Sequence, residues 1–447
     1  MLKIVSEILV FALLTTTTTF ASETQPIANV DDAYLRWNRD RTEVDILEYR
    51  KSKPPTWVLG KKIVFQPRVA TKKGGREVWP QPFVISRKEG TKTKNVRVNL
   101  FKPVFPAYRT QGESVLKSSI VASVFDVNGT NAFCQLMKWA PNGDLEFYRY
   151  TDGSCSDFRP HLVNGKKYYT YGKLLPKPVR GTMAASIVVL DENFDFVREI
   201  PGEFDQHDFL LLGDDHFVSI ESALRRTSQG LLFSDRIVRE HKAGKIEFEW
   251  SISDYMKHVK VPQTAGAYIV EDGSDAVAEL VHLNSVQMLP NEVIIGLGDS
   301  GVVSVNRKTR AINWILGGFH DEFGLTFQQH PYFVHSSKFD PSTNRLLIFQ
   351  NRTLGSALSF TPSRVTAYEI DPKKKALKSF KVIRAGKEIT PFLGSVQESA
   401  PDVYSIGFGK NMTPDAEHFV EFANGRDTMS LRFLTPNSVT YRFYREP

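Results

Sequence analysis

Three histidines occupy equivalent places in a repeating sequence pattern, and they are the residues of this chain best suited to chemistry. His207, His282 and His330 each stand just before, or at the start of, a short apolar run typical of a β-strand. A neutral imidazole can act as a nucleophile or exchange a proton near neutral pH. Asn284 follows His282 by two residues, so both side chains point to the same side of a strand. One histidine at a strand edge is usually a surface or packing residue, but three in register indicate a shared site.

The stretch 312–351 shows the pattern around one of these histidines. An apolar strand ends near Trp314, a Gly317-Gly318 turn follows, and an aromatic-rich loop then leads to Gln329-His330. Its aromatic side chains could stack on an aryl ligand, although core packing explains them equally well. His320 and His335 flank the loop, but their spacing from His330 is wide and no carboxylate is placed beside them. We therefore predict no metal site.

The elements that must position these histidines are strands. After residue 114, short runs rich in Val, Ile, Phe and Tyr alternate with Asn-Gly, Asp-Gly and Pro turns, as in consecutive hairpins. About six such units follow one another without a helical period. This predicts an all-β fold, a six-bladed β-propeller whose first strands line a central channel, where the histidines would meet at one mouth. Two β-sandwiches in tandem are the alternative.

The chain divides into three parts by composition. Residues 1–21 contain Lys3, a short apolar run and a Phe20-Ala21-Ser22 site, which predicts a cleaved signal peptide and a periplasmic or secreted protein. Residues 22–113 are polar and Pro-punctuated, and we expect a small N-terminal extension: a helix or extended arm near 31–49, then a small β appendage. Residues 114–447 form the propeller. The apolar run is too short to span a bilayer, and we expect no transmembrane segment in the mature chain.

Charge and cysteines narrow the classes of partner. The net charge is +7 with 24% charged residues, and the two Lys clusters are expected to be solvated turns. With no matching motif, we expect no nucleic-acid binding; a modest positive field favours small anionic substrates. Cys134 and Cys155 are the two cysteines, and they could form one structural disulfide in an oxidising compartment. The oligomeric state stays open.

Four phrases of the sequence resemble a known family. They are His282-Leu-Asn284-Ser285, Trp314-Ile-Leu-Gly-Gly318, Gln329-His330 and Leu347-Ile-Phe-Gln-Asn351. In order and spacing they look like the bacterial arylsulfate sulfotransferases, over residues of about 205–409. The resemblance implies a periplasmic six-bladed propeller that moves a sulfuryl group between phenols without a nucleotide sulfate donor. It also implies no cofactor, and small-molecule partners: an aryl sulfate and a phenol.

The resemblance further implies a role for each site residue. His330 matches the histidine that becomes transiently sulfurylated, while His207, His282 and Asn284 match residues that hold the sulfuryl and phenolic oxygens. The chemistry agrees, because sulfuryl transfer resembles phosphoryl transfer and needs in-line placement with donors for the equatorial oxygens. An N–S adduct divides the transfer into two steps, and a second histidine protonates the leaving phenolate.

One position departs from the family pattern. Members usually carry an arginine in the strand-to-turn segment after the His-x-Asn-Ser phrase, and here Leu297 stands nearest that place. Losing a bidentate cation from an anion site is not conservative. Arg225, Arg226 or Arg352 could replace it from a neighbouring strand, and we expect Arg352 to bind substrate. Without such a cation, the chain would be a ligand-binding propeller; a third reading is an aryl sulfate hydrolase.

Overall fold

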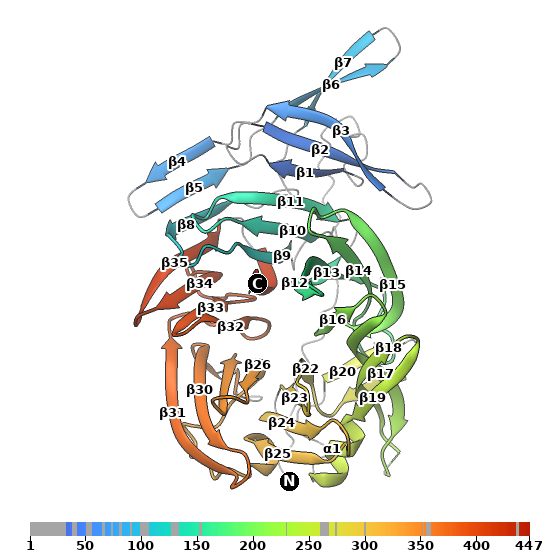
Figure 1. Cartoon of the computed structure of the whole chain (residues 1–447), viewed down its shortest axis with the longest axis vertical. Helices are drawn as coiled ribbons and strands as arrows, with labels where there is room; N and C mark the ends of the chain where they lie inside the picture. Colours follow the sequence, from blue (N-terminus) through green and yellow to red (C-terminus); the bar gives the residue numbers. More distant parts are fainter. Residues whose placement is uncertain are drawn as a thin grey trace, which may run out of the picture.

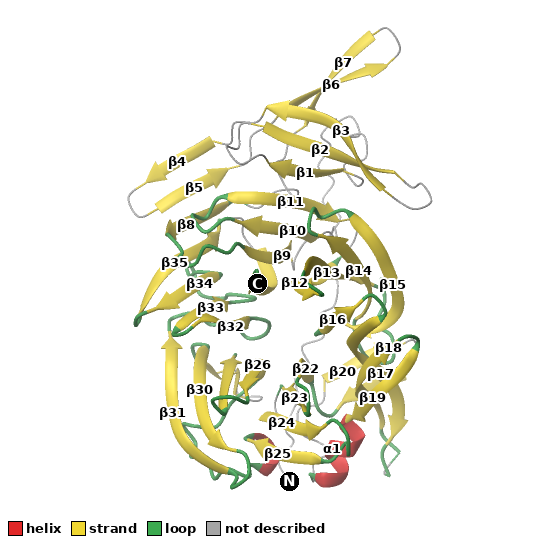
Figure 2. Ribbon diagram, in the orientation of Figure 1, coloured by secondary structure: helices red, strands yellow, loops and turns green. Residues whose placement is uncertain are grey.

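Six sheets, antiparallel except for one parallel strand pair, form a ring around a central axis (Figures 1 and 2). The computed structural model describes residues 33–37, 43–50, 56–64, 68–72, 75–79, 83–89, 92–98, 107–126, 134–151, 154–228, 230–259, 268–272, 275–298, 301–351, 353–354, 359–434 and 438–447. The predicted six-bladed β-propeller is confirmed, and the tandem sandwiches are excluded. Residues 1–21, the predicted signal peptide, lie outside the described part of the chain.

Blades 2 to 5 each have four strands that follow chain order from the axis outward, with β28 and β29 intervening in blade 5. Blade 2 consists of β12 (Cys155–Val163), β13 (Lys166–Leu174), β14 (Ala184–Asp191) and β15 (Phe196–Asp205). Blade 3 consists of β16 (Phe209–Gly213), β17 (His216–Arg226), β18 (Leu232–Lys242) and β19 (Lys245–Ser251). Blade 4 consists of β22 (Leu283–Met288), β23 (Glu292–Leu297), β24 (Gly301–Asn306) and β25 (Ile312–Leu316). Blade 5 consists of β26 (Val334–Asp340), β27 (Arg345–Gln350), β30 (Arg364–Asp371) and β31 (Ala376–Ala385).

Blades 1 and 6 close the ring by combining strands from the two ends of the chain. In blade 1 the last strand, β36 (Ser438–Arg445), lies innermost and pairs with β9 (Ile120–Asp126), followed by β10 (Cys134–Trp139) and β11 (Leu145–Thr151). Blade 6 consists of β32 (Ser395–Ala400), β33 (Val403–Gly407), β34 (Phe419–Ala423) and β35 (Arg426–Phe433), with β8 (Tyr108–Gly112) outside them. The last strand of the chain therefore lines the channel beside the early blades.

Earlier strands extend these two sheets. Blade 1 gains β1 (Ala33–Trp37), β2 (Glu43–Arg50) and β3 (Thr56–Val64), whereas blade 6 gains β4 (Arg68–Lys72) and β5 (Gly75–Trp79). A separate hairpin joins β6 (Phe83–Glu89) to β7 (Lys92–Val98). The expected helix or arm near 31–49 thus contains strands β1 and β2. Between blades 3 and 4 the chain forms α1 (Ile252–His258), β20 (Tyr268–Asp272) and β21 (Asp275–Glu279), and β21 joins the sheet of blade 3 by pairing in parallel with β18. Blade 5 also carries the short pair β28 (Thr353–Leu354) and β29 (Ser359–Phe360).

Local sequence explains the strand order within a blade. At Asn164-Gly165 both residues have positive φ, 49° and 78°, which matches the twist of the two-residue turn joining β12 to β13. β14 is buried along almost its whole length because the faces of neighbouring blades cover it on both sides, whereas β15 alternates intermediate and exposed residues at the outer edge. The buried strand β14 therefore packs between neighbouring blades, and the outermost strand β15 faces solvent.

One disulfide fastens blade 1 to blade 2. Cys134 on β10 bonds to Cys155 at the start of β12, and both are buried. The pairing that the sequence left open is therefore formed in the structure. In the part of the chain that the structure describes, no helix is long and apolar enough to cross a membrane.

Candidate active site

β-bulges on four inner strands deliver the polar residues of the channel. Along β22 and β26 the pairing skips one residue each, Asn284 and His335, and along β36 it skips Tyr441 and Arg442. A similar shift on β12 includes Asp157, whose φ is 45°. A bulge inserts an extra residue and re-aims its side chain. The sheets are therefore regular outside and locally irregular where side chains meet at the axis.

Two of the predicted histidines touch. The Nε2 atoms of His207, just before β16, and His282, just before β22, lie 3.1 Å apart, with their rings almost perpendicular. The Nδ1 atom of His207 is 2.5 Å from an oxygen of Asp205, and that of His282 is 2.8 Å from an oxygen of Glu279. If both Nδ1–H groups donate to carboxylates, the contact between the Nε2 atoms holds one shared proton. The pair is thus built to give and take a proton.

A single buried arginine holds the two carboxylates in place. Arg236 on β18 forms an ion pair with Asp205 and a second one, at 2.5 Å, with Glu279. Burial alone would raise the pKa of Glu279, but the charges of Arg236 and His282 lower it overall. The guanidinium offsets one of the two carboxylate charges, and a proton shared by the two histidines would offset the other, as a buried site requires.

A third imidazole completes the cluster. The ring centroid of His335 on β26 lies 6.3 Å from that of His207. Its Nδ1 is 2.9 Å from the carbonyl oxygen of Gly394, so an Nδ1–H donates there and leaves a lone pair on Nε2. Gly394 has a φ of 108°, and a Cβ there would lie 2.5 Å from Phe349, so this position requires glycine. Burial, with the charges of Arg442 and His207, keeps the pKa of His335 well below its ordinary value. Its imidazole is therefore neutral and fixed.

Asn284 lies beside the cluster with an unused acceptor. Its Nδ2 donates to the carbonyl of Val334 at 2.7 Å, while its buried Oδ1 has no hydrogen-bond partner among the described residues. Across from it, Gly298 leaves room: a Cβ there would lie 3.2 Å from both the Asn284 amide and the Cβ of His282. The backbone thus keeps the space beside His282 and Asn284 open.

The closing strand β36 supplies a tyrosine and an arginine that the sequence did not suggest. The ring of Tyr441 lies 6.0 Å from His335 and 6.2 Å from His207. Its buried hydroxyl has no partner in the described chain, and burial raises its pKa well above the ordinary value. Arg442 donates to the carbonyl oxygens of Asn284, at 2.6 Å, and His335, at 3.3 Å. It therefore places a positive charge next to Asn284 and His335.

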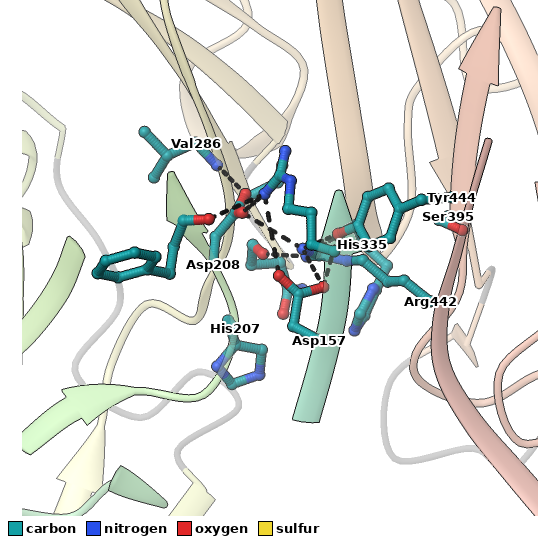
Figure 3. Close-up of polar contacts among 12 residues, drawn as sticks. Asp157, His207, Asp208, Val286, His335, Ser395, Arg442 and Tyr444 are labelled. Atoms are coloured by element: carbon teal, nitrogen blue, oxygen red, sulfur yellow. Dashed lines mark hydrogen bonds and ion pairs between the residues drawn. The ribbon is translucent and has the colours of Figure 1, made fainter. Parts of the chain in front are cut away.

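A network of buried charges lies next to the histidines (Figure 3). Arg442 is 3.6 Å from both Asp157 and Asp208, and Arg159 on β12 pairs with Asp208. Asp208 also accepts from the backbone N–H of Val286 at 2.8 Å. Burial would raise the pKa of Asp208, but Arg159 and Arg442 lower it overall. The network ties blades 1, 2, 3 and 4 together at the axis.

His330 has a different place from the other predicted histidines. Its backbone carbonyl accepts a hydrogen bond from Arg364 on β30, and Tyr368 of the same strand binds the carbonyl of Gln329. β30 is the third strand from the axis, two strand spacings or about 10 Å outward from β26. The His330 ring lies near Tyr332, with centroids 6.3 Å apart, and no described contact joins it to His207 or His282. The structure thus brings His207, His282 and Asn284 together with His335.

A buried leucine occupies the position of the expected arginine. Leu297, at the end of β23, is fully buried in an apolar cluster with Leu283 and Ile295. Arg225 pairs with Asp235 and its side chain is 53% exposed, while Arg226 binds the carbonyl of Gly230 at the surface. Arg352 lies outside the described residues. Arg442 is therefore the cation that the described structure brings closest to Asn284 and His335.

A separate group of possible metal ligands lies at the rim. Ligand atoms of His258, His320 and Glu322 are within 4.8 Å of one another. Both oxygens of Glu322 are already engaged, one by Lys375 and one by the backbone N–H of Ile315. A metal would have to displace these partners, so the group is a weak candidate.

The sequence matches one known protein family. A family model described as arylsulfotransferase (ASST) matches residues 193–445, more than half of the chain. The chain belongs to the arylsulfotransferase family. The matched range contains the three clustered histidines, Asn284 and both residues from β36, whereas Asp157 and Arg159 on β12 precede it. The comparison with curated proteins finds no match.

Solved structures resemble the chain only loosely. A computationally designed protein called Ika8 has 12% identity and a TM-score of 0.32, covering 90% of this chain and 97% of its own. The C-terminal WD40 domain of Sif2 has 9% identity and a TM-score of 0.35, covering 90% and 96%. The AfRom2 CNH domain has 10% identity and a TM-score of 0.33, covering 91% and 96%. The fold assignment rests on the strand pairing described above.

Proposed function

We propose that this arylsulfotransferase-family protein moves a sulfuryl group from a phenolic sulfate ester to a phenol at the histidine cluster. The observation that carries the proposal is the meeting of three imidazoles with opposed roles at one point of the channel. The Nε2 atoms of His207 and His282 lie within hydrogen-bond distance and both rings are backed by carboxylates, whereas His335 presents a neutral Nε2. Together they offer a proton donor and a nucleophile without any cofactor.

In the first half-reaction, the Nε2 lone pair of His335 attacks sulfur and the phenolic S–O bond breaks. The His207–His282 pair protonates the departing phenolate, so the leaving group is neutral. Burial and the charge of His282 keep the pKa of His207 well below its ordinary value, so His207 favours its neutral form. The second half-reaction reverses these steps with a new phenol, and the pair removes its proton.

Charge stabilisation falls to Arg442. The equatorial oxygens of a transferring sulfuryl group carry negative charge, and a fixed cation in a dry site stabilises that charge strongly. Arg442 already influences His207 and His335 electrostatically, as its charge lowers the pKa of both. It thus offers from β36 the charge that Leu297 does not supply from β23. The unpartnered Tyr441 hydroxyl is placed to donate a further hydrogen bond.

We favour His335 over His330 as the nucleophile because of distance from the proton donor. The sequence resemblance assigns the sulfohistidine to His330, whose loop is bound to the third strand of blade 5. His335 stands on the inner strand within the same cluster as His207. Adduct formation in variants of the two residues tests both assignments.

We also propose a periplasmic or secreted location. The disulfide between Cys134 and Cys155 supports it, since disulfides persist in oxidising compartments. Labelling of free thiols in cells after fractionation tests this proposal. Blocked thiols in a periplasmic or extracellular fraction are the expected result.

The direct test of function is release of p-nitrophenol from p-nitrophenyl sulfate, with and without a phenol acceptor. Phenol-dependent release in the wild type, lost in His282→Ala and kept in His216→Ala, is expected. His216 is a suitable control because it forms a comparable contact with Glu240 at 2.8 Å on the outer part of blade 3. Release without an acceptor would show a hydrolase, and no release with several donors would favour a ligand-binding propeller.

A further inference from the structure

A cavity borders the charged network and is not lined by the clustered histidines. Its volume is about 770 Å³, within the range of small-molecule sites. Its lining includes Arg159, Asp208 and Arg442 of the network but none of His207, His282, His335 or Tyr441. On β26 the cavity is lined by Lys338, three residues past His335 and thus about 10 Å further along the channel. The cavity is therefore distinct from the histidine cluster.

Lys338 faces this cavity without a counter-ion. No described residue forms a hydrogen bond or ion pair with its ammonium group, although Asp208 and Asp157 belong to the same network. Both aspartates are already bound: Asp208 by Arg159 and Val286, and Asp157 by Tyr444 at 2.6 Å. Counting the three cations Lys338, Arg159 and Arg442 against these two carboxylates leaves one positive charge unmatched.

Arg159 adds a second set of unused donors. Its Nη1 binds Asp208 and the carbonyl of Phe209, whereas its Nε and Nη2 have no partner among the described residues. The guanidinium also stacks over the ring of Tyr444, 5.0 Å from its centroid, which fixes its plane. Arg159 is near enough to Lys338 to lower the lysine pKa by repulsion, in addition to burial. A bound anion would reduce the repulsion between Lys338 and Arg159 and accept hydrogen bonds from their free N–H groups.

Part of the remaining wall is apolar. Leu162, which is 61% exposed, lines the cavity together with Pro160 and Pro401, among polar side chains such as Gln287 and Gln397. An organic body that covers Leu162 would gain from its burial.

We propose that this cavity is a second ligand site, which binds an organic anion with its sulfonate, sulfate or carboxylate group between Lys338 and Arg159. The apolar body of the ligand lies against Leu162, Pro160 and Pro401. The site uses none of the clustered histidines and needs no turnover, although its lining shares Arg442 with the proposed sulfuryl site.

Calorimetric titration of the full chain with 2-naphthalenesulfonate tests the site. We expect saturable binding in the wild type, weakened about tenfold or more in Lys338→Met, because one charge-assisted hydrogen bond is lost. Lys338→Arg should retain binding, as should His335→Ala. Lys257→Met is the matched control, since this exposed lysine of α1 pairs with Asp254 at the surface.

The protonation of Lys338 on binding gives a second readout, which would not change if Lys338 had only a structural role. Burial and Arg159 lower the pKa of Lys338 to about 8, and a bound anion would raise it again. At a pH near 8, binding should therefore take up protons, seen as a binding enthalpy that depends on the buffer, and Lys338→Arg should abolish this uptake. The charged or titratable groups that face Lys338 or line the cavity are Asp157, Arg159, Asp208, Asp340, Arg345, Glu398, Arg442, Tyr444 and Arg445.

Four results would overturn the inference. The first is no binding to the wild type, and the second is equal binding to Lys338→Met. The third is loss of binding in His335→Ala alone, which would place the probe at the histidine cluster. Equal affinity for 2-naphthalenemethanol, which lacks the charge, would also refute the anion-binding role. Because no arm measures turnover, failure here is distinguishable from failure of the proposed sulfotransfer.

Discussion

Replacing Arg236 by methionine should be among the most damaging single changes near the site. Arg236 is 3% exposed and bridges the carboxylates behind His207 and His282. Removing one partner from a buried ion pair costs about 3–5 kcal/mol, since it leaves uncompensated charge inside the protein. Here two carboxylates lose their cation at once. We therefore expect Arg236→Met to lower the free energy of unfolding by at least that amount.

Arg239→Met is the matched control. It lies three residues further along β18 and also forms two ion pairs, with Glu221 and Glu249, but its side chain is 26% exposed and that of Glu249 is 45% exposed. Pairs in contact with water contribute about 0–1 kcal/mol. Urea unfolding of both variants at neutral pH gives the comparison directly. Equal losses in the two variants would refute the reasoning.

The pH dependence gives an independent check on the same residue. In the wild type the pKa of Glu279 is below its ordinary value of 4.5, so its stabilising effect is present above that pH and lost as pH falls. In Arg236→Met, burial should raise the pKa of Glu279. Protonation of Glu279 at low pH would then remove the buried negative charge that destabilises the variant. The stability gap between wild type and Arg236→Met should therefore narrow from neutral pH to a pH below 4.5. A gap that stays constant would contradict the assigned charge pairing.

Two further predictions concern stability. The disulfide closes a loop with a sequence separation of 21 residues, so Cys134→Ala with Cys155→Ala should lower the free energy of unfolding by about 3 kcal/mol, measured by urea titration; an unchanged midpoint would argue against the bond. His207 and His335 have folded-state pKa values well below 6.5, so the unfolded chain binds more protons as pH falls through that value. Stability should fall by about 1.4 kcal/mol per pH unit for each, and His335→Gln should reduce this slope; an unchanged slope would refute it.

The fold could be predicted from the sequence because each blade of a propeller repeats the same turn and strand patterns. Turn residues such as Asn164-Gly165 and the apolar runs after them recur in each blade, and each recurrence supports the others. The N-terminal extension offered no such repetition, and there strands β1 and β2 occupy a region where either a helix or an extended arm was expected. Tertiary pairing of β1 with β11 is what specifies these strands.

The site was predicted in part. His207, His282 and Asn284 precede or begin inner strands, so the repeat phase alone indicates that they converge. His335 was missed as a member of the cluster, because the extra residue in β26 breaks the alternation on which a period-two argument depends.

The other residues around the histidines differ in how readily the sequence predicts them. Asp205 and Glu279 stand two and three residues before their histidines, and this spacing could have been noticed. Arg236, Tyr441 and Arg442 reach the site from distant strands, and only ring closure by β36 brings residue 441 beside residue 207.

The most direct test of the central claim is the intact mass of the protein after brief incubation with p-nitrophenyl sulfate and no acceptor. The account predicts an adduct of one sulfuryl group on the wild type and on His330→Ala, removed by added phenol. The same treatment of His335→Ala should give no adduct. An adduct that persists in His335→Ala, or that disappears in His330→Ala, would contradict the proposed nucleophile.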